Sequence, residues 1–436
     1  MLTGFLRAFR TPDLRKKLLF TVFIIAVFRL GQQLPTPGVS EAAVRTCSNA
    51  SKGSLFQLLN LFSGGSITKL TVFALGIMPY ITASIILQLL AVVIPRLETL
   101  RKEGQTGQAK ITQYTRYLTI GLAILQSTGI IALARSGNLV PGCTASLIPN
   151  PSVFTIATMV LIMTSGTAVI MWLGELITDK GVGNGMSVVI FTQIIAVVPG
   201  QLQLIYESKG KFIFALVLIM AIVVIAFVAL MEQAQRRIPI QYAKRMVGRR
   251  MYGGTSTYIP LKINQAGVIP VIFASSLLYI PQLAAQLFGH VTAGGTPSAG
   301  WAQWVDSNLV ISDKPAYAIA FFLLILFFTY FYVSITFNPE EVADGMKKSG
   351  GFIPGIRPGG PTAGYLSHVL SRLTAAGSLY LALIALIPVV AIGLLDATAQ
   401  FPLGGTSILI MVGVGLDTVK QIESQLQQRN YEGFLR

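Results

Sequence analysis

Ten apolar runs, most of them about as long as a membrane is thick, constrain this chain more than any other feature. A run of about 20 apolar residues crosses a bilayer as a helix, because a helix satisfies its backbone hydrogen bonds internally. Hydrophobic residues make up 53% of the chain and charged residues only 11%. We therefore predict an all-α polytopic membrane protein with spans over residues 18–34, 71–94, 114–134, 153–177, 184–200, 211–231, 265–288, 315–337, 370–392 and 404–419. No small-residue cleavage site follows the first run, so it is predicted to be a retained span.

Basic residues predict the orientation of these spans. Lys and Arg are about four times more numerous in the two tails and the loops after even-numbered spans than in the opposite loops, and cytoplasmic segments carry such an excess. Both termini are therefore predicted to be cytoplasmic.

A short motif occurs twice. The second span contains GIMPYITAS (residues 76–84) and the seventh contains GVIPVIFAS (267–275), and both fit G-x-x-P-x-I-x-A-S. The copies run in opposite directions through the membrane, as in an inverted repeat whose proline-interrupted helices lie at the working site. We expect an N-terminal half (1–205) and a C-terminal half (206–436), with a hinge at 206–211. Each proline is expected to weaken its helix near mid-membrane. The alternative is a chance match, because these residue types are common in membrane helices.

The predicted spans offer little chemistry. Coupled transporters place ionisable side chains inside the membrane. In this chain Arg29 lies in the second half of its span and is expected to snorkel outward. Glu175 and Asp417 fall at cytoplasmic helix ends. A small-solute transporter is disfavoured, and it remains the alternative. His290 and His368 are assigned to opposite sides, and no nucleotide or metalloprotease motif is present. We predict no enzyme activity, cofactor or metal site.

Two cytoplasmic loops, residues 232–262 and 338–366, are longer than most connections between helices. The first contains seven Lys or Arg residues and three tyrosines but one acidic residue. Such loops suit phosphate backbones or an acidic protein partner, and anchoring on anionic lipid is the alternative. Their turn-forming stretches GGTST and PGIRPGGP favour folded loops over unstructured basic tails.

Eight stretches of the chain, in loops as well as spans, are spread over most of its length. They are LFSGG, FALGIMPYITASIILQLL, RKEGQTGQAKITQYTRY, MWLGELITDKGVGNGMS, QRRIPIQYAKR, NQAGVIPVIFASS, FNPEEVADGMKKSGGFIPGIRPG and GGTSILIMVGVGLDTV. In these stretches the chain resembles the SecY family, the channel subunits of the bacterial Sec protein-conducting translocon, and the resemblance extends over nearly the whole chain.

The resemblance implies two inverted five-helix halves that close like a clamshell around a pore, with a lateral gate between spans two and seven. Unfolded secretory proteins would cross through the pore, and membrane proteins would leave sideways into lipid. The implied pore constriction is an isoleucine ring formed by Ile81, Ile85, Ile190, Ile194, Ile272 and Ile410. The implied lateral-gate residues are Pro79, Ser84, Gln88, Pro270 and Ser275.

The same resemblance implies partners and a location. Arg249, Arg250 and Arg357 would engage the ribosome or the SecA motor. SecE would clamp the two halves, SecG would accompany it, and signal sequences, unfolded polypeptides and membrane lipids would contact the channel. The location implied is the bacterial cytoplasmic membrane.

The apolar segment at residues 55–66 is too short to span a bilayer, because nine helical residues reach only about 14 Å. It resembles the family's plug, a re-entrant helix beneath the isoleucine ring, with a flexible joint at Gly64, Gly65 and Ser66 and an outer end near Lys69. An interfacial helix on the outer leaflet is the alternative. The implied plug residues are Leu55, Phe56, Leu58, Leu59, Asn60, Leu61, Phe62, Ser63, Gly64 and Gly65.

The chain's two cysteines, Cys47 and Cys143, both fall in predicted outward-facing loops, where oxidation is permitted. A disulfide between them would stay within one half, and two free thiols are the default.

Overall fold

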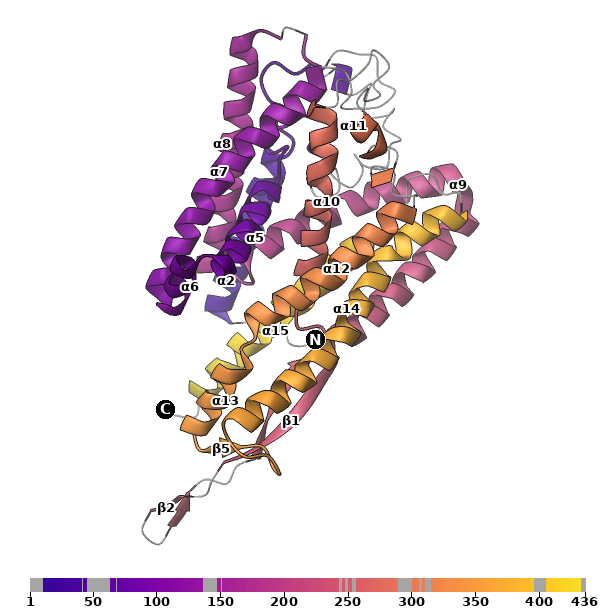
Figure 1. Ribbon diagram of the computed structural model, residues 1–436. Helices are drawn as coiled ribbons and strands as arrows, with labels where there is room; N and C mark the ends of the chain where they lie inside the picture. The colour runs from indigo at the N-terminus through magenta and orange to yellow at the C-terminus, as the bar shows by residue number, and fades with distance from the viewer. Residues whose placement is uncertain are drawn as a thin grey trace.

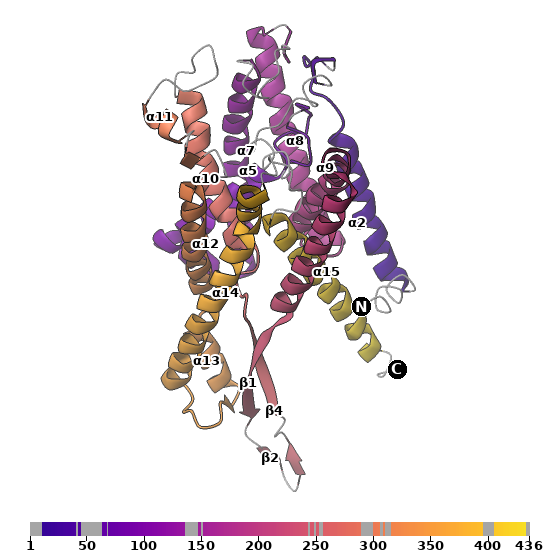
Figure 2. The same ribbon diagram turned by 90° about the vertical axis from the view of Figure 1, so that its right-hand side faces the viewer.

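The protein is mainly helical (Figures 1 and 2). The computed structural model describes residues 11–40, 42–44, 63–67, 69–135, 147–149, 151–242, 245–247, 250–252, 256–288, 300–305, 308–309, 315–395 and 405–432. Its helices are α2 (Pro12–Gly31), α5 (Met78–Val93), α6 (Pro95–Lys102), α7 (Gln105–Arg135), α8 (Val153–Lys180), α9 (Gly185–Gln233), α10 (Ile269–Phe288), α11 (Gly300–Val305), α12 (Pro315–Thr336), α13 (Pro339–Lys348), α14 (Gly360–Leu395) and α15 (Gly405–Glu432).

Every predicted span overlaps a helix, and two of them share α9. Gly210 divides α9 with a φ of 81°, and it falls inside the segment 206–211 predicted as a hinge. By length and composition alone, five helices in the described part of the chain could cross a membrane, or six if the bent pair α5 and α6 is one span. That bend of 102° arises at Ile94, which is extended because the following Pro95 disfavours helical backbone.

The repeated motif starts a helix in both copies. Gly76 and Gly267 have positive φ values of 57° and 61°, and the helices begin two residues later, at Met78 and Ile269. The prediction that each proline weakens its helix near mid-membrane is therefore wrong, because neither proline of the repeat interrupts a helix. Pro79 and Pro270 are each the second helical residue, where the backbone N–H would have no partner within the helix. The matching local structures support a true internal repeat.

Residues 71–77 also differ from expectation, because Thr71 forms an isolated β-bridge with Pro35 and residues 72–77 form turns before α5. Non-helical backbone at membrane depth is tolerated where protein covers it. Six of these seven residues are buried, and only Val72 is partly exposed.

The helices pack around apolar clusters. One cluster joins α7 and α8 to residues near the start of α5 and includes Ala123, Ile131 and Met163. A second joins α10, α12, α14 and the later part of α9 and includes Phe273, Ile325 and Leu381. In Figure 1 the N-terminal helices α2, α5, α7 and α8 (indigo to purple) gather on one side, with α12, α14 and α15 (orange to yellow) on the other.

The two long loops fold into one unit. Strand β1 (Gln235–Tyr242) pairs antiparallel with β4 (Ser256–Lys262), and the two-residue strand β5 (Gly351–Phe352) joins the other edge of β1. Strands β2 (Arg245–Val247) and β3 (Arg250–Tyr252) form a second hairpin near the tip, which projects beyond the helices in Figure 2. The prediction of folded loops is confirmed.

Candidate channel constriction, gate and cytoplasmic platform

The predicted isoleucine ring comes from four helices. Ile81 and Ile85 lie one turn apart on α5, Ile190 and Ile194 one turn apart on α9, Ile272 on α10 and Ile410 on α15. Residues four apart share a helix face. Five of the six belong to one apolar cluster, in which Ile190, Ile194 and Ile410 are buried and Ile81 and Ile272 are partly buried. Ile85 belongs to the neighbouring cluster, against which Ile81 also packs.

A buried polar side chain adjoins this ring. Gln193 directly precedes Ile194, and it is fully buried (0% exposed). No protein group in the described part of the chain pairs with either end of its side-chain amide. Sequence reasoning did not select Gln193, although a glutamine inside the apolar run VVIFTQIIAVV is a visible signal.

The predicted gate residues lie on two helices, α5 and α10, that contact each other. Pro79 and Pro270 are buried, Ser84 and Ser275 are partly buried, and Gln88 is exposed. Their polar groups bond within their own helices: Gln88 Nε2 donates to Ser84 Oγ (3.3 Å) and Ser275 Oγ donates to the carbonyl of Ile272 (2.9 Å). Among the described residues, no hydrogen bond or ion pair joins α5 to α10. Packing alone holds α5 against α10. An exposed polar bond does join the neighbouring helices across the seam, from Arg101 on α6 to the carbonyl of Ile335 on α12 (3.2 Å).

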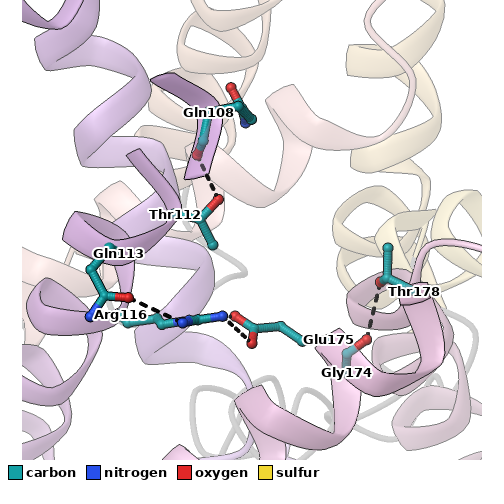
Figure 3. A network of polar contacts seen from close by, with 7 residues as sticks. All are labelled: Gln108, Thr112, Gln113, Arg116, Gly174, Glu175 and Thr178. Carbon is teal, nitrogen blue, oxygen red and sulfur yellow. Dashed lines mark hydrogen bonds and ion pairs between the residues drawn. The ribbon is translucent and has the colours of Figure 1, made fainter. Parts of the chain in front are cut away.

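A polar network fixes the N-terminal helices to one another (Figure 3). The Arg116 guanidinium on α7 donates twice to the Glu175 carboxylate on α8, at 2.9 and 2.7 Å, which is the strong bidentate geometry. Gln113 Oε1 accepts a further bond from Arg116 (3.1 Å). Thr178 Oγ1 on α8 accepts from the N–H of Gly185, the first residue of α9 (2.9 Å). This side of the molecule is therefore held together by polar bonds as well as packing.

The hairpin connects directly to the gate helix α10. Asn264, between β4 and α10, donates through Nδ2 to Glu232 Oε1 (2.6 Å) and to the carbonyl of Gly267 (3.1 Å). Glu232 and Asn264 are buried, at 8% and 2% exposed, and the adjacent Lys262 pairs with Asp417 on α15 (3.5 Å). Sequence reasoning missed this joint, although Glu232 is the one acidic residue of loop 232–262.

The predicted partner-binding residues are only partly described. Arg250 lies in β3 at the hairpin tip, and Arg357 is exposed in the turn after β5, where its carbonyl accepts from Thr362 Oγ1 (2.8 Å). Arg249 lies outside the described residues. The described contacts join β5 to β1 but do not bring Arg250 and Arg357 together.

Most of the predicted plug also lies outside the described residues, as do Cys47 and Cys143. Of the predicted plug residues, Ser63, Gly64 and Gly65 are described, and the two glycines have φ values of 66° and 85°. Ser63 and Ser66 are each 1% exposed, so the joint predicted to be flexible has a buried base. Arg29, expected to snorkel outward, donates to Gln32 Oε1.

Four apolar helices place isoleucine side chains in one cluster. Beside this cluster, two helices contact each other through packing alone. These features define a polytopic helical membrane protein of the channel class. The SecY family model matches residues 71–419. A protein translocase subunit SecY from Streptomyces galbus is 63% identical over the full length of both chains. The chain therefore belongs to the SecY family, which is a family of protein-conducting channels and not of enzymes.

Solved structures show the same fold. The structure of a protein-conducting channel superposes on this chain with a TM-score of 0.63 at 19% identity, and the match covers 94% of this chain and 91% of the other. Sec61 in the canine ribosome-channel complex superposes with a TM-score of 0.59, also at 19% identity and with the same coverage.

Proposed function

We propose that this chain is a protein-conducting channel of the bacterial cytoplasmic membrane, which passes unfolded secretory proteins outward and releases apolar segments sideways into lipid. The observation that carries the proposal is the joining of Ile81, Ile190, Ile194, Ile272 and Ile410 from four helices in one apolar cluster. A narrow apolar constriction dewets and opposes ion flow. It can widen around a polypeptide because its side chains make no directional bonds.

The proposed orientation places both termini in the cytoplasm. Leu14 and Leu18 near the start of α2 pack with Val182 and with Ile422 near the end of α15, so the two ends of the described chain lie together. In Figure 2 they lie toward the same end of the molecule as the hairpin. The charge distribution of the loops supports the cytoplasm as that side.

The proposed partners bind the hairpin and loop 338–366. SecA or a ribosome would drive or feed the channel at this cytoplasmic platform, and SecE, with SecG, would brace the helices. The canine structural neighbour is described as a ribosome-channel complex. This chain would bind its motor through exposed basic residues such as Arg357.

Reconstitution tests the function. The chain would be incorporated into vesicles with SecE and supplied with SecA, ATP and a secretory precursor, and protease protection of the precursor would be measured. We expect a protected product that depends on ATP and on the channel. Absence of that product, with the same partners active on a relative's channel, would contradict the proposal.

Charge reversal at the platform tests how partners bind. We expect Arg250→Glu together with Arg357→Glu to weaken SecA or ribosome affinity on the order of tenfold, which corresponds to about 1.4 kcal/mol, because both changes replace attraction by repulsion. Binding would be measured on vesicles, with the amount of assembled channel as a check on folding.

The matched control is Arg236→Glu, an exposed position in β1 near the base of the same hairpin. This substitution reverses a charge on the hairpin at a distance from the proposed contacts, so it should lower SecA or ribosome affinity less. Equal loss in the control, or loss of assembled protein in the double variant, would count against a specific binding role.

A further inference from the structure

The two copies of the repeated motif are attached to the preceding helix in the same way. In each copy, the residue four positions before the first glycine of the motif donates its N–H to a carbonyl just beyond that helix. Val72 donates to Leu34 after α2, and Ile263 donates to Ala234 after α9, each at 3.0 Å. The start of α5 and the start of α10 are therefore joined to the helix before them by equivalent backbone contacts.

One position later, the two copies use different chemistry. In the first copy Phe73 stacks on Phe28 near the end of α2, with ring centroids 5.8 Å apart, and a Cβ on Gly31 would overlap the Phe73 ring. In the second copy Asn264 holds this position and bonds to Glu232 in the last turn of α9 (2.6 Å). The joint is thus apolar before α5 and polar before α10.

The polar joint is costly to form. Glu232 is buried, and a buried carboxylate destabilises a fold unless hydrogen bonds replace its hydration. Its place in the last turn of α9 adds to the cost, because a helix C-terminus disfavours negative charge. An apolar pair joins the equivalent elements in the first copy, so cohesion does not require the carboxylate. A hydrogen bond adds a preferred direction, which apolar packing lacks.

Asn264 connects this bond to the start of α10. Its Nδ2 also donates to the carbonyl of Gly267 (3.1 Å), whose φ of 61° turns the chain into α10. The adjoining Ala266 is buried against Val333 of α12 and Leu370 of α14. The start of α10 is therefore held by packing from α12 and α14 and by one side chain that ties it to the end of α9.

We propose that Glu232 and Asn264 are positioning residues that set the direction in which α10 leaves the base of the hairpin, and with it the width of the contact between α10 and α5. This inference rests on the proposed lateral release between these two helices. Because packing alone holds α5 against α10, a change in the direction of α10 at its start alters the contact along its length.

Crosslinking in vesicles measures that width without any translocation. Ser84→Cys on α5 and Ser275→Cys on α10 would be placed in a chain whose own two cysteines are replaced by serine, and thiol reagents of increasing length would join them. The test variant adds Glu232→Met with Asn264→Leu, which replaces both partners by apolar side chains of similar size, so that neither is left buried without the other. We expect joining by the shortest reagent to fall several-fold and joining by longer reagents to rise.

Two further variants serve as controls. Glu232→Gln keeps an oxygen that accepts from Asn264, so the shortest reagent should join α5 to α10 as efficiently as in the chain with the natural pair. Lys262→Met lies at the same hairpin base and removes only the exposed ion pair with Asp417 (3.5 Å). It should leave joining by every reagent unchanged.

The outcomes separate positioning from a general role in folding. If the double variant is assembled in the normal amount and the shortest reagent joins it as efficiently as the natural pair, the inference fails. It also fails if Lys262→Met or Glu232→Gln widens the contact equally, or if the double variant is not assembled, since the pair would then serve the fold as a whole. The proposed channel does not depend on these results, and it fails only if the unmodified chain translocates no precursor.

Discussion

Replacing Ile190, Ile194 and Ile410 together by asparagine is expected to raise resting ion conductance by at least about tenfold, equivalent to lowering the barrier to ion passage by about 1.4 kcal/mol. These side chains are 6%, 0% and 1% exposed and share one apolar cluster from two helices, α9 and α15. Amide groups would hydrate the constriction and remove the dewetting that opposes ions. Conductance of reconstituted channels in planar bilayers measures the effect.

Two controls separate the constriction from packing. Ile→Leu at the same three positions keeps the ring apolar at constant volume and should stay tight. Ile170→Asn with Ile177→Asn places the same amides at fully buried sites in the same cluster, but on α8 and outside the ring. That variant loses stability without gaining conductance. Equal leak from the α8 variant would show that any damage to the cluster opens the channel and that the ring has no special role.

The helices could be predicted from the sequence because the bilayer leaves few alternatives for an apolar run. The apolar runs did not reveal the residue at which each helix starts. Residues 71–77 are as apolar as a helix of this kind requires, yet the positive φ of Gly76 delays α5 until Met78. The repeated G-x-x-P carries this information, since proline favours the first helical turn and glycine permits positive φ. A proline inside an apolar run also fits a weak point near mid-membrane, and the sequence alone does not separate the two possibilities.

The candidate site likewise has a part that could be predicted from the sequence and a part that could not. The six isoleucines could be selected by resemblance, and a spacing of four predicts a shared helix face for the pair on α5 and for the pair on α9. Pairs between distant segments could not be selected, because nothing local in the sequence identifies the partner. Arg116 binds Glu175 across 59 positions, and Gln32 binds Ser63 across 31. Glu232 and Asn264 are a similar case, separated by the whole hairpin.

A short covalent link between α5 and α10 is expected to stop translocation. Ser84→Cys and Ser275→Cys would be introduced into a chain carrying Cys47→Ser and Cys143→Ser, and reducible bifunctional thiol reagents of increasing length would join them. Both serines are partly buried on helices that contact each other. A helix with its side chains is about 10–12 Å wide, so lateral release requires the seam to part by a similar distance. Protease protection of a precursor should fall to the level seen without ATP, and it should recover with longer reagents or after reduction.

The control crosslink joins two N-terminal helices, α7 and α8. Arg116→Cys and Glu175→Cys replace residues whose side chains are 2.7 Å apart on α7 and α8, and the same reagents would join helices that the proposed opening leaves together. Translocation by this variant should be equal before and after linking. Because both measurements use the same variant, the loss of the ion pair affects them equally. Polar bonds already fix α7 to α8, whereas packing alone holds α5 against α10. If both links stop translocation, the whole helical body must deform and the seam is not the gate. If only the link between α5 and α10 does so, the seam between these two helices is the part that opens.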